Sequence, residues 1–528
     1  MGAATSSPKE SPSLLSSSLL TFPLIEEEEE KKEQKDDQPQ DQQEDDATNI
    51  NDASIKITRA AKLYAFCAAL NSCNLGYDIG VNTGAGMLLQ NSLELSDVQL
   101  EAFFGSLNLF AMVGALCSHT VNDKFGRRWS FRLAAMIFIL GTILQSAAYN
   151  YVMLMIGRAF VGLGLGFGLA VDPLYIAEIS PPECRGRLVN WSEFGINLGI
   201  VFGFASGLMF ATVEEDVAWR LMFSLGAILP CFVIYFATFV MPESPRWLVA
   251  NDRVREACEV LKKVYPDGSD VGMIVTEIKD SIEKERIAAD AVGWGVILFP
   301  TPAFKRLLMV GIGISIAQQA VGIDAITLFL VFVLKESGIH SRMTQMWILL
   351  CFGVIVLGTL FLAGCLLDRT GRRPLVFISL LGMSISSFIV AMSFIGAVSS
   401  EVGAIIGLGL YQAFFSIGMG PATWTIASEV FPTSIRAKAM SLATFGNRAT
   451  ATIFASSFLS VATAMTWSGF FIMMSVVCLV ILLWVHVYVP ETKGLSLEEM
   501  AHYFAEITGD ESILKVEGTC TQEEEILP

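Results

Sequence analysis

Long apolar stretches recur along the chain, separated by short polar segments. Twelve of them are long enough to be membrane-spanning helices, since about 20 apolar residues cross the hydrocarbon core of a bilayer. The pattern therefore predicts an all-α polytopic membrane protein. The expected spans are residues 61–83, 101–122, 132–149, 152–178, 188–211, 219–241, 305–334, 344–367, 374–397, 402–428, 439–463 and 466–489.

A polar stretch, residues 242–304, separates the sixth span from the seventh. Apolar positions recur at helical spacing in residues 247–264 and 274–287, which predicts short amphipathic helices on the membrane surface. We therefore expect two six-helix halves joined by a cytoplasmic helical linker. The halves are residues 59–241 and 305–489, and residues 490–528 follow as a last cytoplasmic helix with an acidic tail.

The net charge of −17 comes from the two ends of the chain. Residues 1–58 hold 14 acids and 5 bases, and residues 490–528 hold 10 acids and 2 bases. The first segment has too little apolar surface to offset its ordering entropy, so we expect a disordered acidic tail at 1–58. The nearly neutral remainder argues against a basic surface for nucleic acid.

Other chemistry is not indicated. The ten cysteines are scattered without CxxC spacing and the four histidines are dispersed, so neither a disulfide framework nor a metal site is expected. The apolar patch at residues 19–25 lacks a basic leader, so we expect no cleavable signal peptide. Without a P-loop or a catalytic triad, the sequence predicts neither an enzyme nor an ATP-driven pump, and no cofactor.

Basic residues follow alternate spans and so predict the orientation. They come after spans 2, 4, 8 and 10, whereas the intervening loops near Glu94 and Glu214 are acidic. By the positive-inside rule, both termini and the linker are cytoplasmic.

The two halves also repeat one another. DKFGRR at 123–128 recurs as DRTGRR at 368–373, and PES at 242–244 recurs as PET at 490–492. Glu178 and Arg185 recur as Glu429 and Arg436. Echoes at nearly one period predict two parallel repeats, an arrangement typical of transporters with a midplane site between rocking halves.

Between about residues 60 and 500 the chain resembles the sugar-porter family of the major facilitator superfamily. The resemblance implies twelve spans and secondary transport of a monosaccharide or polyol by alternating access. The motifs that carry it are GYDIGVNTGA (76–85), DKFGRR, GRAFVGLGLG (157–166), PLYIAEISPPECRGRL (173–188), PESPRWL (242–248), QQAVGIDA (318–325), DRTGRRPL (368–375), GMGPATW (418–424), SEVFPTSIRAKA (428–439) and PETKG (490–494).

An acid, Asp78, lies inside the first span, where a charge costs about 2.5–3.5 kcal/mol on insertion scales. Arg158 in the fourth span is the expected partner. Asp78 lies about 24 Å along a helix from Lys62, and Arg158 about 30 Å from Glu178, so both fall at similar depth. The resemblance implies that Asp78 accepts a coupling proton and that Arg158 is its partner; the alternative is a static ion pair.

A hydroxyl-rich substrate needs amides, carboxylates and an aromatic face. Gln318 and Gln319 lie near mid-membrane in the seventh span. The resemblance implies that Asn447 and Trp424 supply a sugar-binding amide and indole. Interhelical hydrogen bonding and plain packing are the alternatives for these four side chains.

Several positions depart from the hexose pattern. Glu193, Asp324 and Arg448 stand where hexose porters have Gln, Asn and Trp, and these three resemble the polyol and inositol branch. We expect Arg448 to neutralise Glu193 or Asp324, or these charges only to pair with each other.

Further departures bear on the substrate and on packing. Leu328 and Phe329 replace two gate tyrosines, and Val356 replaces a polar residue. Asp172 has no role in the family, and we expect a water-lined or helix-end carboxylate. His119 replaces the glycine that Gly364 keeps in the second half, so we do not expect close packing at the end of the second span.

A set of charges at the cytoplasmic ends resembles the family's inner salt-bridge network. Ion pairs that form only when the halves touch inside would stabilise an outward-open state; the alternative is a purely topological use of these arginines. Glu243 and Arg246 are expected to tie the linker to this network. Its other members are Asp123, Arg127, Arg128, Glu178, Arg185, Asp368, Arg372, Arg373, Glu429 and Arg436.

The sequence therefore predicts a proton symporter for a monosaccharide or polyol. A facilitative uniporter and a sugar sensor that signals through its tails remain as alternatives. The expected partners are a small sugar or polyol and the lipid bilayer, with no nucleic acid, and the expected unit is a monomer. We expect a multi-pass protein of the plasma membrane, with the vacuolar membrane or the plastid envelope as alternatives.

Overall fold

Helices make up all the regular structure in the residues that the computed structural model describes. These are residues 57–514, apart from 267, 292–294, 396–399 and 433. The acidic N-terminal tail expected at 1–58, except for its last two residues, and most of the acidic C-terminal tail lie outside the described residues.

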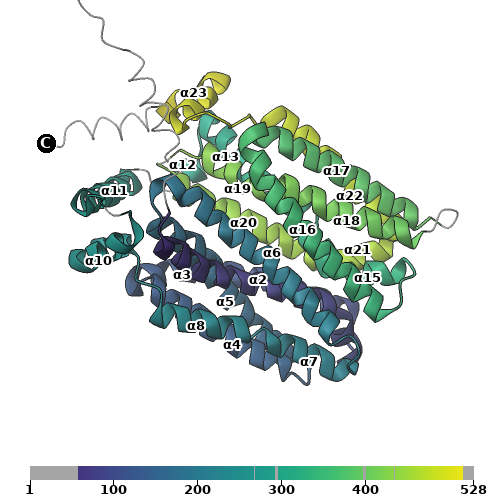
Figure 1. Ribbon diagram of the computed structural model, residues 1–528. Coiled ribbons are helices and arrows are strands. Elements are labelled where there is room, and N and C mark those ends of the chain that lie inside the picture. Colours follow the sequence, from purple (N-terminus) through teal and green to yellow (C-terminus); the bar gives the residue numbers. More distant parts are fainter. Residues whose placement is uncertain (1–56, 267, 292–294, 396–399, 433, 515–528) are drawn as a thin grey trace, which may run out of the picture. The chain divides into compact units, whose positions relative to one another are not determined.

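The N-terminal half, purple to teal in Figure 1, begins with a helix of 34 residues. Its elements are α2 (Arg59–Ser92), α3 (Asp97–Phe125), α4 (Arg127–Ser146), α5 (Tyr151–Ile179), the short 3₁₀ turn η1 (Pro182–Cys184), α6 (Arg185–Met209), α7 (Glu215–Leu225) and α8 (Ile228–Phe239).

The C-terminal half, green to yellow in Figure 1, contains more interrupted helices. Its elements are α13 (Pro302–Ala320), α14 (Ile323–Leu328), α15 (Leu330–Glu336), α16 (Arg342–Thr370), α17 (Arg372–Ser393), α18 (Glu401–Ile417), α19 (Met419–Val430), α20 (Arg436–Ala455), α21 (Phe458–Met465) and α22 (Trp467–Tyr488).

Each of the twelve expected spans coincides with one helix or with consecutive helices. Within the described residues, ten are long and apolar enough to cross a membrane. The first and eleventh expected spans, α2 and α20 with α21, are not among them. Their interiors hold polar groups, including Asp78 on α2 and Arg448 on α20, so apolarity alone does not mark them.

Small residues set how α2 lies against α6. A Cβ added to Gly203 of α6 would lie 2.6 Å from the Cα of Gly80 on α2, and one added to Gly199 would lie 2.1 Å from the carbonyl oxygen of Cys73. Such close backbone approach between spans needs small residues. The packing fixes the rotation of α2 and so helps to aim its polar residues.

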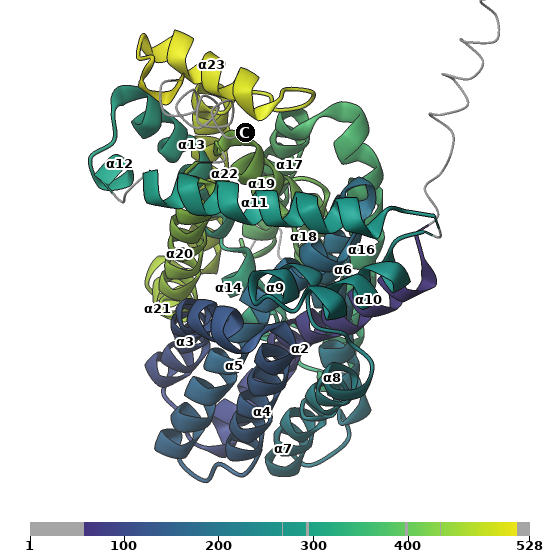
Figure 2. The ribbon, with the colours of Figure 1, turned by 90° about the vertical axis from the view of Figure 1, so that its left-hand side faces the viewer.

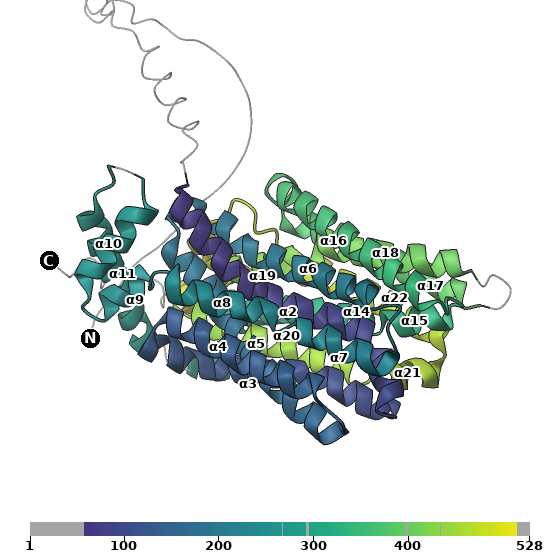
Figure 3. The ribbon, with the colours of Figure 1, turned by 60° about the horizontal axis from the view of Figure 1, so that its bottom comes forward.

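The linker lies at one end of the helices (Figures 1 and 3), and Figure 2 looks onto that end. Its helices are α9 (Pro245–Ala250), α10 (Val254–Val264), α11 (Val271–Ala291) and α12 (Gly295–Leu298). The last helix, α23 (Leu497–Thr508), packs against α13 and α19. Just after it, a carboxylate oxygen of Asp510 accepts a hydrogen bond from the Ala303 N–H at 3.1 Å.

The two halves touch at the end opposite the linker. Arg342, in the first turn of α16, donates to the carbonyl oxygens of Phe210 and Val213 at 2.9 and 3.0 Å. Glu101 near the start of α3 accepts hydrogen bonds from Ser460 on α21. These contacts close the far end between the halves.

Candidate functional site: a buried ion pair beside a central cavity

Asp78 and Arg158 form an ion pair between α2 and α5. One Nη of Arg158 lies 3.0 Å from one carboxylate oxygen of Asp78 and 3.2 Å from the other. Asp78 is 3% exposed and Arg158 is fully buried. The pairing expected from the sequence is therefore present, and each charge offsets the cost of burying the other.

Arg158 is also held by α3. Its Nε donates to the carbonyl oxygen of Phe103 at 3.1 Å, and its guanidinium lies 4.4 Å from the centre of the Phe103 ring. A cation over an aromatic face gains further attraction when it is removed from water. These contacts keep the guanidinium in place, so the ion pair connects three helices of the N-terminal half.

A cavity with about 1020 Å³ of space, part of it open to solvent, lies between the two halves. Six of the seven residues predicted to bind substrate line it, namely Glu193, Gln318, Gln319, Asp324, Trp424 and Arg448. Leu75 and Ile79, on either side of Asp78 in sequence, line its N-terminal wall.

The seventh predicted residue, Asn447, lies behind the cavity wall and is fully buried. Its amide nitrogen donates at 2.8 Å to the side-chain oxygen of Gln318. The amide nitrogen of Gln318 donates in turn to the carbonyl oxygen of Gly420 at 2.9 Å. Asn447 therefore orients Gln318, whereas Gln318 itself lines the cavity.

Gly322 breaks the seventh span at φ +82°. This left-handed conformation suits a residue without a Cβ. The break ends α13 just after Gln318 and Gln319 and places Asp324 in the first turn of α14. A single bend thus brings amides and a carboxylate to the same cavity.

Three charged side chains line the cavity. A guanidinium nitrogen of Arg448 lies 3.9 Å from a carboxylate oxygen of Asp324, and Glu193 lines the same cavity. The same nitrogen donates to the Asn108 side chain of α3 at 3.2 Å, which links α20 to the other half. Asn108 was not predicted, because an isolated Asn in a span carries no distinctive signal.

The positions that replace the gate tyrosines are apolar and buried. Phe329 stacks on Phe458 of α21 with ring centres 4.9 Å apart and meets the edge of Phe104 on α3 at 5.0 Å. Leu328 is 3% exposed. Val356, another departure, lines the cavity. Phe329 therefore joins an aromatic cluster that connects the two halves on the side away from the linker.

The charges at the linker end of the N-terminal half form a compact cluster. Arg127 at the start of α4 donates to both carboxylate oxygens of Glu178 on α5, at 2.7 and 2.9 Å. Glu243, beyond α8, accepts from the backbone N–H of Arg127 at 2.8 Å. Arg128 donates to the carbonyl oxygens of Ala237 and Thr238 at the end of α8.

The C-terminal half repeats this cluster. Arg372 at the start of α17 donates to Glu429 on α19 at 2.8 Å, and Glu491 accepts from the backbone N–H groups of Arg372 and Arg373. Glu491 was not singled out as a site residue, although the PES and PET repeat marks it as the counterpart of Glu243. Arg373 itself donates to the carbonyl oxygen of His486.

In the structure, Glu178 and Glu429 pair with the arginines that begin α4 and α17. Glu178 binds Arg127, whereas Arg185 is exposed in the first turn of α6. Glu429 binds Arg372, and Arg436 donates to the carbonyl oxygen of Phe431. The reason is geometric. Arg127 and Arg372 begin helices that lie against these acids, whereas Arg185 and Arg436, seven residues after the acids, begin the next span.

The remaining predicted members are more loosely placed. Asp123 is exposed and lies 3.7 Å from Arg127, and its carbonyl oxygen accepts from Trp247 of the linker at 2.8 Å. Arg246 is half-buried on α9. The Asp368 side chain lies outside the described residues.

Neither His119 nor its counterpart Gly364 in the second half is tightly packed. The His119 side chain is 83% exposed and contacts Asp123, and among the described residues no atom lies within 4 Å of a Cβ added at Gly364.

Comparison with known proteins gives the family. The family model described as "Sugar (and other) transporter" matches residues 64–504. Probable polyol transporter 4 of Arabidopsis thaliana is 37% identical over 465 residues, covering 87% of this chain and 88% of that protein. A glucose transporter of Staphylococcus epidermidis is 30% identical, covering 84% of this chain and 96% of that protein.

Solved structures give the same result for the fold. The inward-open xylose transporter XylE of E. coli matches with a TM-score of 0.72 and 26% identity, over 83% of this chain and 98% of that one. The proton:xylose symporter XylE bound to 6-bromo-6-deoxy-D-glucose matches with a TM-score of 0.69 and 25% identity, over 84% and 98%.

The fold is therefore that of a major facilitator transporter, which is a multi-pass membrane protein and not an enzyme. The chain belongs to the sugar transporter family of this superfamily, which moves sugars and polyols.

Proposed function

We propose that this protein is a proton symporter that moves a polyol, or a related monosaccharide, by alternating access of the central cavity. In this proposal the chain has twelve spans, with both termini and the linker in the cytoplasm. The observation that carries the proposal is the buried Asp78–Arg158 pair, 3.0 Å apart, between α2, which lines the cavity, and α5.

The ion pair provides a means of coupling. While Asp78 is ionised, Arg158 attracts it and holds α2 to α5. A proton on Asp78 removes that attraction and leaves the guanidinium with its contacts to Phe103. The energy difference between the two arrangements can bias a two-state equilibrium, which is the requirement for coupling.

The contacts between halves support an inward-open conformation. They lie at the end opposite the linker. The distribution of basic residues in the sequence assigns this end to the outside. The likeness to the inward-open transporter, with a TM-score of 0.72, supports the same conformation.

The charges of the cavity favour a polyol. Glu193 and Asp324 offer four carboxylate oxygens that accept hydrogen bonds from hydroxyls, and Arg448 offsets part of their charge. Trp424 lines the same space. Several relatives carry the name polyol transporter, which supports this choice.

The test is uptake of radiolabelled sorbitol, myo-inositol, xylose and glucose into proteoliposomes, with and without an inward pH gradient. We expect accumulation of at least one polyol above equilibrium only with the gradient. Asp78→Asn is expected to abolish accumulation while sparing exchange of substrate, and Asp97→Asn, an exposed acid on α3, serves as the matched control. Uptake that ignores the gradient would identify a uniporter, and gradient-driven accumulation by Asp78→Asn would overturn the role of this acid.

Substrate choice has its own test. Glu193→Gln and Asp324→Asn remove a charge but little volume, so we expect the apparent KM for the polyol to rise about tenfold, which corresponds to about 1.4 kcal/mol. The Glu499→Gln control on α23 lies far along the chain from the cavity. An unchanged KM in both cavity variants would remove the carboxylates from the substrate site.

A further inference from the structure

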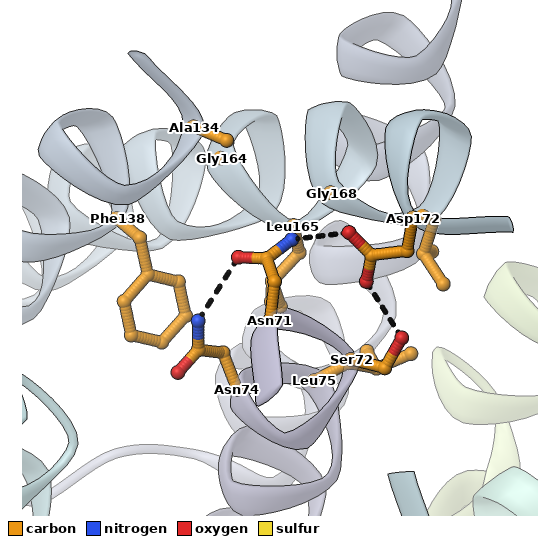
Figure 4. Close-up of a pocket in the computed structure, with 11 residues that line it drawn as sticks. Asn71, Ser72, Asn74, Leu75, Ala134, Phe138, Gly164, Leu165, Gly168 and Asp172 are labelled. Carbon is orange, nitrogen blue, oxygen red and sulfur yellow. Dashed lines mark hydrogen bonds between the residues drawn. The ribbon is translucent and has the colours of Figure 1, made fainter. Parts of the chain in front are cut away.

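A second buried carboxylate lies between α2 and α5. Asp172 is 1% exposed, and its oxygens accept hydrogen bonds from the side chains of Asn71 at 2.9 Å and Ser72 at 2.6 Å. Asn74 donates to Asn71 at 3.1 Å. Figure 4 shows these four side chains as a chain of hydrogen bonds along the wall of a small cavity.

The partners of Asp172 are all neutral. The cavity is lined from α2, α4 and α5, and among the lining residues Asp172 is the only titratable group. In the described part of the chain, the side chains that donate to the carboxylate are the neutral groups of Ser72 and Asn71. An ionised Asp172 is thus a buried charge without a counter-charge, in contrast to Asp78 with Arg158.

Neutral hydrogen bonds compensate a buried charge only in part. An ion without a counter-ion is costly in a medium of low polarity, and binding a proton removes that cost. The backbone of α5 is also interrupted next to Asp172. Pro173 lies inside α5 and has no N–H, so the carbonyl group of Leu169 lacks its usual helical donor on the same cavity wall.

Asp172 and Asp78 lie along the same helix pair. Asn71 lies seven residues before Asp78 on α2, about 10 Å along the helix, and Asp172 lies 14 residues beyond Arg158 on α5, about 21 Å. Asn71, Asn74 and Asp78 are spaced by three and four residues, so they share one face of α2. Polar side chains therefore line the α2–α5 interface from Asp78 toward the linker end.

We propose that Asp172 is a second proton-binding site, which takes up and releases a proton between Asp78 and the linker side of the protein. This second site depends on the proposed function only in one respect, namely that its proton is used in transport. Proton binding at Asp172 is itself measurable without any substrate.

The test is infrared spectroscopy of the full-length protein in detergent, recorded as the pH is raised stepwise. A protonated carboxylic acid has a carbonyl stretching band that disappears when the acid ionises. We expect one such band to be missing in Asp172→Asn and retained in Asp78→Asn. Asn is nearly the same size as Asp and can still accept from Ser72, which favours a folded variant.

Ser72→Ala provides an independent readout. The Ser72 hydroxyl donates a hydrogen bond that stabilises the ionised carboxylate. Because the variant lacks this hydrogen bond, we expect the band of protonated Asp172 to persist to higher pH. A purely structural Asp172 predicts no such displacement. The site is overturned if the spectra of wild type and folded Asp172→Asn are identical at every pH. If Asp172→Asn does not fold, an unchanged titration in Ser72→Ala overturns it instead. The transport assay tests the proposed function alone. Its failure would not change these infrared spectra.

Discussion

Glu101 of α3 accepts hydrogen bonds from both the backbone N–H and the hydroxyl of Ser460 on α21, at 2.7 and 2.5 Å. The two residues belong to different halves, and Glu101 is only 1% exposed. The carboxylate therefore ties the halves together at the end away from the linker, at the start of a helix where free N–H groups attract negative charge.

Glu101→Ala is expected to weaken this closure. A hydrogen bond to a charged group contributes about 1.5–3 kcal/mol, so the equilibrium between the two end states is expected to shift by at least about tenfold. The distance between spin labels on α3 and α21, measured by pulsed electron resonance, reports the shift. Thr463→Ala on α21 is the control, since its hydroxyl bonds only within its own helix. An unchanged distance distribution in Glu101→Ala would show that this contact does not hold the halves.

Asp78→Asn is expected to destabilise the protein. It leaves Arg158 charged and buried without its counter-ion, and breaking a buried pair in this way costs about 3–5 kcal/mol. Thermal unfolding in detergent measures the loss as a lower Tm. The double variant Asp78→Asn/Arg158→Gln removes both charges, so we expect part of the Tm to return. A double variant less stable than Asp78→Asn would contradict mutual compensation.

Gly126→Ala and Gly371→Ala are expected to lower stability by about 1–2 kcal/mol each, because both positions have left-handed backbones. Their φ angles are +87° and +94°, and an added Cβ would lie 2.5 Å from Glu243 and 2.9 Å from Glu491. Gly186→Ala on α6 is the matched control, since its Cβ would meet no atom within 4 Å. Equal Tm values for Gly126→Ala and Gly186→Ala would argue against the strain.

The attachment of the C-terminal segment is expected to depend on acid pH. Hydrogen bonds from Ala303, Thr301 and Ser512 lower the pKa of Asp510 from 3.8 to about 2. Because the folded pKa is depressed, the contribution is present above about pH 4 and is lost as the pH falls toward 2.

A spin label at position 502 of α23, introduced by His502→Cys, is expected to become more mobile over that interval. In Asp510→Asn the change with pH is expected to disappear, because the titrating carboxylate is gone. A label that stays equally immobile in wild type down to pH 2 would contradict the role of Asp510.

Much of the fold was predictable because apolar length and periodicity determine where helices can cross a bilayer. The Asp78–Arg158 contact was predictable for a related reason: two opposite charges inside apolar spans, at matching depth, have few other ways to lower their cost. The duplicated DKFGRR motif likewise located the two basic clusters, although not which acid each arginine binds.

The remaining contacts depend on features that a linear pattern does not reveal. Asn447 contacts Gln318 and not the cavity surface, because a helix rotation of a fraction of a turn separates lining from supporting positions. Glu101 looked like an ordinary acid at the end of a span, and only the position of α21 shows its partner. Asp172 could be seen in the sequence, but its neutral surroundings could not.

The paired clusters at Arg127 and Arg372 have a mechanical consequence. Each fastens the ends of its own three helices, through Glu178 and Glu243 in one case and Glu429 and Glu491 in the other. Bending within either half would have to break these hydrogen bonds, whereas movement of one half against the other leaves both clusters intact. The two clusters therefore favour movement of each half as a rigid body, with the change of contacts at the surfaces where the halves meet.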